Sequence, residues 1–178
     1  MEYKNLPNEL SFKKDDAKFK IYGYASIFGN CDAYGDIIAK GAFEESITFK
    51  KDIKFLWQHD ASSPIGNIDR LYEDSKGLCI EASINCQLMQ GREAALLIKD
   101  KAIDSLSIGF TINKSHISKN GERIITDLKL WEISLVTFPA NQMAKITDNY
   151  KSHLHNQLNK IEKSLINLER SIYGRNFK

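Results

Sequence analysis

Residues 105–113 read SLSIGFTIN, and in this stretch apolar side chains alternate with small or polar ones. An alternation with a period of two indicates a β-strand that packs one face against a core. Residues 123–141 read RIITDLKLWEISLVTFPAN and predict one or two further strands, which should stop at Pro139 because proline cannot donate to a strand ladder. Between them, SKNGER (118–123) predicts a turn that brings the two segments close together.

The rest of the chain up to about residue 146 alternates strand patterns with turns. β-Branched and aromatic residues, which suit a pleated surface, predict strands in four more segments: 17–28, 52–60, 64–74 and 78–84. Residues 29–36 are dense in glycine, asparagine and aspartate and predict a turn, while two short helices are expected at 41–49 and 90–102. Together these elements favour an α+β fold, as a mostly antiparallel β-barrel ringed by short helices.

Residues 147–178 read as a single amphipathic helix. Its apolar residues step alternately by four and three along the chain: Leu154, Leu158, Ile161, Leu165, Leu168 and Ile172. This spacing is an a/d heptad seam, and a short helix with such a seam exposed is only marginally stable in water. The seam therefore needs a partner, which is a second copy, another protein or the surface of the preceding domain. We accordingly expect a domain at 1–146 and a C-terminal heptad helix at 147–178, which serves docking or oligomerisation or is a self-cleaved tail.

Composition narrows the classes of function. The chain has 178 residues, 42% of them hydrophobic and 27% charged, which suits one globular domain with a real core. A net charge of +2 gives no electrostatic reason to expect nucleic acid as a partner. No apolar run approaches ~18 residues, so no membrane partner is expected, and the N-terminus has no apolar core of a secretory signal. The three cysteines lack CxxC or metal spacing, which favours reduced thiols in a cytosol, and we expect neither a metal nor a cofactor.

Three residues stand out as candidates for chemistry. His59 ends the apolar segment FLWQHD and precedes an expected Ser-Ser-Pro turn, a position that suits a catalytic group as well as a histidine bonded to backbone. Ser107 lies on the small, polar side of its strand, where a hydroxyl is open either to an extended substrate or only to solvent. Glu132 lies in an apolar strand, and a carboxylate there needs a partner because its burial alone is costly.

These three residue types can form a catalytic set. A histidine removes the proton of a serine hydroxyl, while a carboxylate holds the histidine in the correct tautomer and stabilises the imidazolium. Such a set would use Ser107 as nucleophile, His59 as general base and Glu132 to orient His59. Asp60 is a poor substitute for Glu132, because neighbouring side chains point apart on an extended chain. Arg92 and backbone amides near Ser107 are candidates for oxyanion donors.

Four blocks of sequence, in this order, resemble the prohead maturation protease family of tailed phages. They read YGYASIFGNCDAYGDIIAKGAF (22–43), FLWQHDASSPIGNI (55–68), GREAALLIKDKAIDSLSIGF (91–110) and LWEISLVTFPAN (130–141). The resemblance implies an assemblin-like serine peptidase fold related to the herpesvirus capsid maturation protease. It implies a nucleophile at Ser107 and a catalytic histidine at His59, while Glu132 takes the place of a second histidine in the herpesvirus relatives.

The resemblance also implies a biological setting. Members of the family cleave the scaffold, or the scaffold-like segment of the major capsid protein, and often themselves. They do so inside the procapsid, in the cytoplasm of the bacterial host, with no cofactor implied and with a homodimer expected. The alternative is a noncatalytic assembly or scaffold protein that binds capsid protein through its C-terminal helix.

Overall fold

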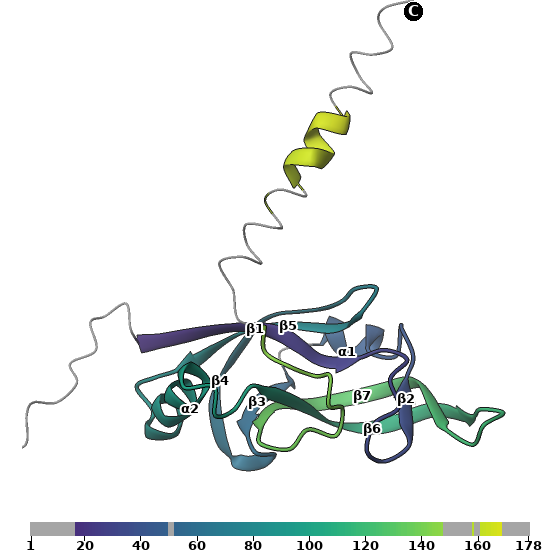
Figure 1. Ribbon diagram of the computed structural model, residues 1–178, viewed down its shortest axis with the longest axis horizontal. Helices are drawn as coiled ribbons and strands as arrows, with labels where there is room; N and C mark the ends of the chain where they lie inside the picture. Colours follow the sequence, from purple (N-terminus) through teal and green to yellow (C-terminus); the bar gives the residue numbers. More distant parts are fainter. Residues whose placement is uncertain (1–16, 50–51, 148–157, 159–160, 169–178) are drawn as a thin grey trace, which may run out of the picture. The chain divides into compact units, whose positions relative to one another are not determined.

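The computed structural model describes residues 17–49, 52–147, 158 and 161–168. The chain divides into two compact units, Met1–Ile146 and Thr147–Lys178. The first unit carries the strands β1 (Lys18–Ile27), β2 (Asp36–Ile38), β3 (Lys54–Trp57), β4 (Asp60–Glu73), β5 (Gly77–Asn85), β6 (Ser105–Ile117) and β7 (Arg123–Val136), with the helices α1 (Glu44–Thr48) and α2 (Met89–Lys99) (Figure 1).

Most of these elements agree with the sequence pattern. β6 and β7 form the predicted pair around the 118–123 turn, and β7 is a single strand that ends at Val136, before Pro139. The short strand β2 was not predicted, because it overlaps a segment whose glycines and aspartates indicate a turn. It forms because its three residues pair with the start of β7.

Strand β7 lies at the centre of the sheet's connectivity. The strand order is β1-β5-β4-β3-β7-β2, and β6 pairs with β7 as well. All neighbours are antiparallel except β3–β7 and β2–β7, which are parallel, so the prediction of a mostly antiparallel sheet is confirmed. As a result, β7 places residues of β3 and β6, which are distant in sequence, beside its own side chains.

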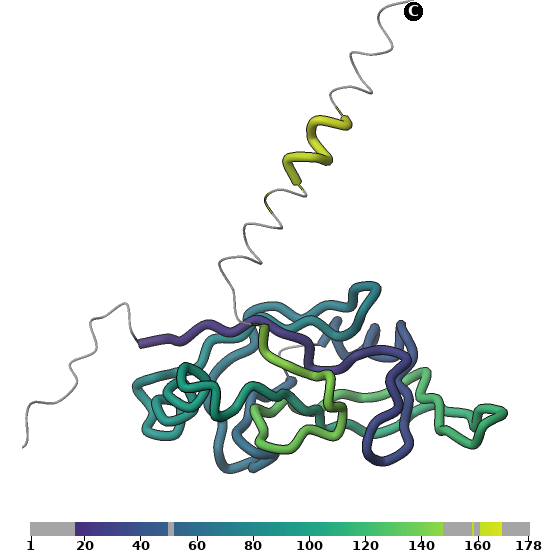
Figure 2. The backbone as a smooth tube through the Cα atoms, in the orientation of Figure 1, coloured from purple at the N-terminus to yellow at the C-terminus, as the bar shows by residue number. Residues whose placement is uncertain are grey.

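The segment just after β7 joins two strands that do not pair with each other along their length. The backbone N–H of Tyr24, in β1, donates to the Lys145 carbonyl at 3.0 Å. The Leu106 N–H of β6 donates to the Ala144 carbonyl at 2.9 Å, and the Ile146 N–H donates to the Asp104 carbonyl at 2.7 Å. The chain path in Figure 2 shows this segment crossing toward β1. The sheet is therefore curled into a half-barrel whose first and sixth strands are tied through residues 144–146.

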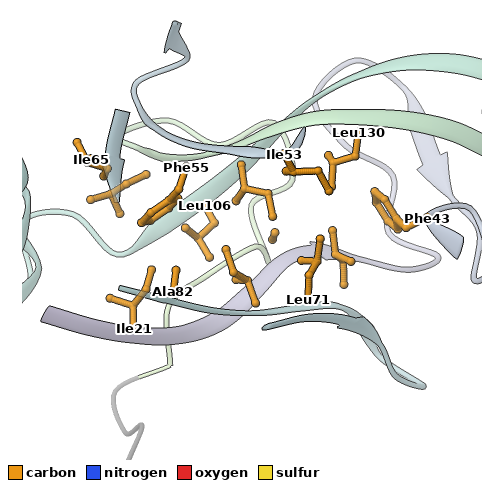
Figure 3. Packing of buried hydrophobic residues seen from close by; sticks show 14 of the residues in the cluster. Ile21, Phe43, Ile53, Phe55, Ile65, Leu71, Ala82, Leu106 and Leu130 are labelled. Carbon is orange, nitrogen blue, oxygen red and sulfur yellow. The ribbon is translucent and has the colours of Figure 1, made fainter. Parts of the chain in front are cut away.

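The core fills the concave side of this curl. Phe55 of β3, Leu106 of β6 and Ile21 of β1 are buried, and Figure 3 shows them converging with side chains from the other strands. Phe43, which immediately precedes α1, closes the core from the helix side. Strands that face such a core on one side explain the apolar alternation of the sequence.

The expected ring of helices is not confirmed. In the described part of the first unit there are two helices: α2 packs on β4 and β5, and α1 packs on β4 and β7. The reason lies in the connections: β3–β4, β4–β5 and β6–β7 are joined by short turns, so helices arise between β2 and β3 and between β5 and β6. Elsewhere in the first unit, the curl of the sheet and the loops enclose the core.

In the second unit, the structure describes residue 158 and residues 161–168, all helical and exposed. They include four residues of the predicted seam, each more than half exposed: Leu158, Ile161, Leu165 and Leu168. Leu154 and Ile172 lie outside the described residues, so the full heptad helix stays a prediction. Among the residues that were described, no helix is long and apolar enough to cross a membrane.

Gly23 tests how residues 144–146 hold the sheet. A Cβ at this position would lie 2.4 Å from the Lys145 carbonyl oxygen and 2.9 Å from the Ile146 Cα, so backbone would have to move. We expect Gly23→Ala to lower the free energy of unfolding by roughly 1–3 kcal/mol, the usual cost of overpacking. Lys18→Ala, an exposed change in the same strand, serves as control and should stay within about 0.5 kcal/mol. Equal urea midpoints for the two variants would contradict the close crossing.

Candidate active site

The β6–β7 ladder places the candidate nucleophile and the candidate acid on one face of the sheet. Ser107 lies opposite Ser134, and Gly109 lies opposite Glu132, with no irregularity between these two pairs. Residues directly opposite each other in an antiparallel ladder point to the same side, and so do residues two apart on one strand. Ser107 and Glu132 therefore share a face, as the sequence argument requires.

His59 reaches this face from a tight turn. Trp57 pairs with Asp60, so Gln58 and His59 form a two-residue hairpin loop between β3 and β4. Their φ angles are 51° and 61°, as expected for a type I′ turn, whose two central residues both have positive φ. The predicted Ser-Ser-Pro turn after His59 is wrong: Ser62, Ser63 and Pro64 belong to β4, and the chain reverses at His59 itself.

A short hydrogen-bonded chain links His59 to β7. His59 Nδ1 lies 2.6 Å from Glu132 Oε1. The Ser134 hydroxyl donates to Glu132 Oε2 at 2.6 Å and accepts the backbone N–H of His59 at 3.1 Å. Both carboxylate oxygens are therefore engaged, and Ser134 fixes the histidine's backbone as well as the carboxylate. The partner that the position of Glu132 demands is His59.

This pairing sets the electrostatics of the histidine. The hydrogen bond with Glu132 raises the pKa of His59, burial lowers it, and the negative charge of Glu132 raises it again, with a net increase. Because the folded-state pKa is raised, the pair stabilises the fold at pH values below the unfolded pKa, and this contribution is lost as the pH rises through the folded pKa. With Nδ1 held by the carboxylate, Nε2 is the nitrogen left to exchange a proton.

Gly109 provides the space that the carboxylate occupies. A Cβ added there would lie 2.4 Å from Glu132 Oε1, the oxygen that bonds His59. Any larger residue would push the carboxylate away from the histidine. The absence of a side chain at Gly109, on the Ser107 side of β6, therefore has a steric reason: it leaves room for the Glu132 carboxylate.

His59 and Ser107 line the same cleft, which has a volume of about 250 Å³. Its walls come from β1, the 29–36 turn, β6 and the 137–141 segment, and include Ser26, Asp32, Tyr34, Phe110, Phe138 and Asn141. Ser107 is buried, with 5% of its surface exposed, so the alternative of a solvent-facing serine row does not describe it. Arg92 lies on α2 and is not among the residues that line the cleft. A second cavity, of about 370 Å³, lies along α1 and β7 and contains none of the three candidates.

Two side chains that the sequence argument missed hold the wall after β7. The Gln58 amide donates to Thr137 Oγ1 at 2.8 Å and accepts the Thr137 N–H at 3.2 Å. The Asn141 amide donates to the Ile27 carbonyl at 3.1 Å and accepts from the Asn30 side chain at 3.0 Å. Ser134 was missed too, although its position two residues after Glu132 on one strand was a usable signal.

Metal ligation receives no support from the described side chains, which form no group of three or more histidine, cysteine or acidic residues placed to hold an ion. Asp32 instead caps the turn before β2, since its Oδ1 accepts the backbone N–H groups of Tyr34 and Asp36. Asp36 pairs with Arg123 through two hydrogen bonds of 2.6 and 2.7 Å. These contacts build the cleft wall.

Residues 8–160 match the family described as Caudovirus prohead serine protease. The chain belongs to this family. It is similar to the prohead protease of Enterobacteria phage HK97, with 32% identity over 143 residues that cover 78% of this chain and 63% of the relative. It is also similar to the prohead protease of Escherichia phage T5, with 33% identity over 129 residues that cover 69% and 59%. The chain thus spans less than two thirds of the length of these curated relatives.

A third match is the capsid polyprotein of Pseudomonas phage PAJU2, 35% identical over 145 residues that cover 75% of this chain and 20% of that protein. Among solved structures, the bacteriophage T4 capsid assembly protease gp21 aligns with a TM-score of 0.50 and 13% identity, over 66% of this chain and 82% of that one. The KSHV protease in complex with a hexapeptide phosphonate inhibitor aligns with a TM-score of 0.50 and 11% identity, over 72% and 63%. These likenesses show a shared fold, and the family expected from the sequence is confirmed.

The positive φ of His59 gives a test of the turn that is independent of activity. Glycine adopts this conformation without steric cost, whereas alanine does not. We expect His59→Gly to be more stable than His59→Ala by about 1 kcal/mol in urea unfolding, although both lack the imidazole. The matched pair Lys54→Gly and Lys54→Ala, in the extended backbone of β3, should show the opposite order. The same order at both positions would rule out the left-handed turn.

Proposed function

We propose that this chain is a serine endopeptidase in which Ser107, His59 and Glu132 act together. The observation that carries the proposal is the 2.6 Å contact between His59 and Glu132 at the edge of a cleft that Ser107 also lines. An imidazole held by a carboxylate near a serine hydroxyl is the arrangement that acyl transfer needs. Membership of a family of prohead proteases supports the same reaction class.

In the proposed mechanism, the Ser107 hydroxyl oxygen attacks the scissile carbonyl carbon, and its proton passes to His59 Nε2. Glu132 stabilises the imidazolium that forms. The tetrahedral intermediate then expels the amine, which takes the proton from His59, and leaves an acyl group on Ser107. A water molecule then attacks this ester while His59 takes one of its protons, and His59 returns that proton to Ser107 Oγ as the C–O bond breaks and the carboxylic acid product leaves. Backbone amides near Ser107 remain candidates for oxyanion donors, whereas Arg92 does not line the cleft.

The proposed substrate is an extended protein segment. Tyr34 and Phe138 line the cleft and are 81% and 90% exposed, so their rings are available to apolar side chains of a bound peptide. We propose that this segment belongs to the scaffold, to the scaffold-like part of the major capsid protein or to the protease itself. A similarity to a protein named as a capsid polyprotein is consistent with a capsid substrate. The proposed place of action is the procapsid in the host cytoplasm, with a homodimer as the proposed assembly.

A second candidate is a noncatalytic assembly protein, which the second unit fits equally well. Its described helical residues expose Leu158, Ile161, Leu165 and Leu168, which an isolated helix has no reason to carry on one seam. We propose that residues 147–178 dock the chain to capsid protein or to a second copy, or are removed by self-cleavage. Docking is compatible with either function, so catalysis has to be tested at the cleft.

Intact mass after overnight incubation, with and without the purified major capsid protein, tests the catalytic proposal. We expect the wild-type protein to trim itself or its partner at defined junctions, and Ser107→Ala to leave both intact while remaining folded. Ser105→Ala is the matched control: Ser105 lies two residues earlier on β6, is buried and does not line the cleft. A fluorophosphonate should label wild type but neither Ser107→Ala nor His59→Ala. Cleavage by Ser107→Ala would overturn the nucleophile, and absence of wild-type cleavage and labelling would favour the assembly protein.

The pH dependence of fluorophosphonate labelling tests the role of Glu132. The neutral imidazole is the active base, so the rate should rise with pH as His59 loses its proton at its raised pKa. Glu132→Gln weakens the hydrogen bond and removes the charge that together raise this pKa, so we expect the acidic limb to move to lower pH while the maximal rate falls roughly 10²–10⁴-fold. Glu122→Gln is the control. Glu122 lies in the β6–β7 turn, where its backbone N–H donates to the Ser118 hydroxyl, and its replacement should leave the profile unchanged. A limb that does not move in Glu132→Gln would contradict the assignment.

A further inference from the structure

Ser26 is an anomaly in the cleft wall. It lies near the end of β1, 1% of its surface is exposed, and it lines the cleft that also holds His59 and Ser107. Among the described residues, its hydroxyl is the one buried side-chain nitrogen or oxygen that has no hydrogen-bond partner. A buried hydroxyl normally has a partner, because losing its bonds to water without replacement is unfavourable.

Three other buried serines of the first unit follow that rule. The Ser46 hydroxyl donates to the Leu128 carbonyl at 3.1 Å and accepts the Leu130 N–H at 2.9 Å. The Ser83 hydroxyl donates to Asp69 Oδ2 at 2.5 Å, and Ser134 bonds Glu132. These three do not line the cleft, whereas Ser26 does. The buried hydroxyl without a hydrogen-bond partner, that of Ser26, is therefore located in the cleft, where a ligand would lie.

An irregularity in the backbone of β1 lies directly before Ser26. The register with β5 shifts between Tyr24 and Ser26, so Ala25 is left out of the pairing as a bulge. A β-bulge redirects the side chains that follow it and is common next to active sites. Immediately beyond, the Ile27 carbonyl is held by the Asn141 side chain, which is itself part of the cleft wall. On the other side, the Ser26 carbonyl is packed so closely on Gly77 that a Cβ there would lie 2.1 Å away.

We propose that the Ser26 hydroxyl binds substrate by donating a hydrogen bond to a main-chain carbonyl of the peptide in the cleft. This inference rests on the proposed function and names a substrate-binding residue for it. An extended peptide presents a carbonyl at every residue whatever its side chains, so the contact would support binding of any sequence that the cleft accepts. Because the acceptor arrives only with the substrate, the hydroxyl stays unpaired in the free chain.

The proposal predicts opposite effects on stability and on binding. Ser26→Ala removes an unpaired buried hydroxyl and empties the volume of only one atom beside the cleft, so the urea midpoint should be unchanged or higher. Peptide binding should weaken by roughly 5-fold, the value of one ordinary hydrogen bond. A serine that served only the fold would behave the other way, since its loss would lower the midpoint and leave binding alone.

The experiment uses a fluorescein-labelled peptide of ten residues, copied from the junction mapped in the mass experiment. Its Kd is measured by anisotropy for the full chain carrying Ser107→Ala, which binds without cutting, and for the same chain carrying Ser26→Ala as well. Ser46→Ala in the same background is the control, because it removes a partnered buried hydroxyl outside the cleft; its midpoint should fall and its Kd should not change.

A weaker Kd with an unchanged or higher midpoint supports the proposal. An unchanged Kd, or a Kd that weakens only as far as the midpoint falls, overturns it. The two levels of inference remain separable. Normal cleavage by the wild-type chain with an unchanged Kd defeats the role of Ser26 alone, whereas a wild-type chain that cuts no junction defeats the proposed function and this inference with it.

Discussion

The carboxylate of Glu132 constrains the whole of the site. It lies in the middle of the sheet with its side chain 12% exposed, where an unpaired charge would be strongly unfavourable. Three features around it follow from this. Gly109 leaves the room that its oxygen needs, Ser134 satisfies one oxygen, and His59 satisfies the other. The histidine's raised pKa is the electrostatic consequence of the same contact.

The topology explains how residues 73 positions apart meet at that carboxylate. β7 pairs with β6 in antiparallel fashion and with β3 in parallel fashion, so one strand collects Ser107 from one neighbour and the His59 turn from another. The segment after β7 then returns to tie β1 and β6 together at residues 144–146. The cleft is thus bordered by strands whose relative positions are fixed by backbone hydrogen bonds, and this rigidity suits a site that must hold its groups in place.

The sequence predicted what depends on local periodicity and on the cost of an isolated charge. The alternation in 105–113 indicated β6, and the apolar surroundings of Glu132 indicated that it needs a partner, which the structure supplies as His59. Parallel pairing of β3 with β7 could not be predicted, because a parallel partner leaves no turn signal in the sequence. The turn at Gln58 and His59 was not predicted for a different reason: it lacks the Asn-Gly, Asp-Gly or Gly-Gly pair that usually marks a type I′ turn. The burial of Ser107 could not be predicted either, because it depends on segments that are distant in the sequence.

Two features that are unfavourable for folding occur at or beside the cleft. Two consecutive residues with side chains adopt positive φ in the turn that carries His59, and the buried Ser26 hydroxyl lacks a partner, while the buried hydroxyls of Ser46 in α1 and Ser83 in β5 are satisfied. Strained or unsatisfied groups persist where the surrounding structure holds them and where function favours them. The His59–Glu132 contact is already formed in the chain without substrate, so on the proposed function no ordering of the catalytic pair is needed before cleavage. Restraint of such a protease would then come from access to its substrate. On the proposed function, assembly of the protease together with its substrate would grant that access, because it would raise the effective concentration of the substrate around the cleft.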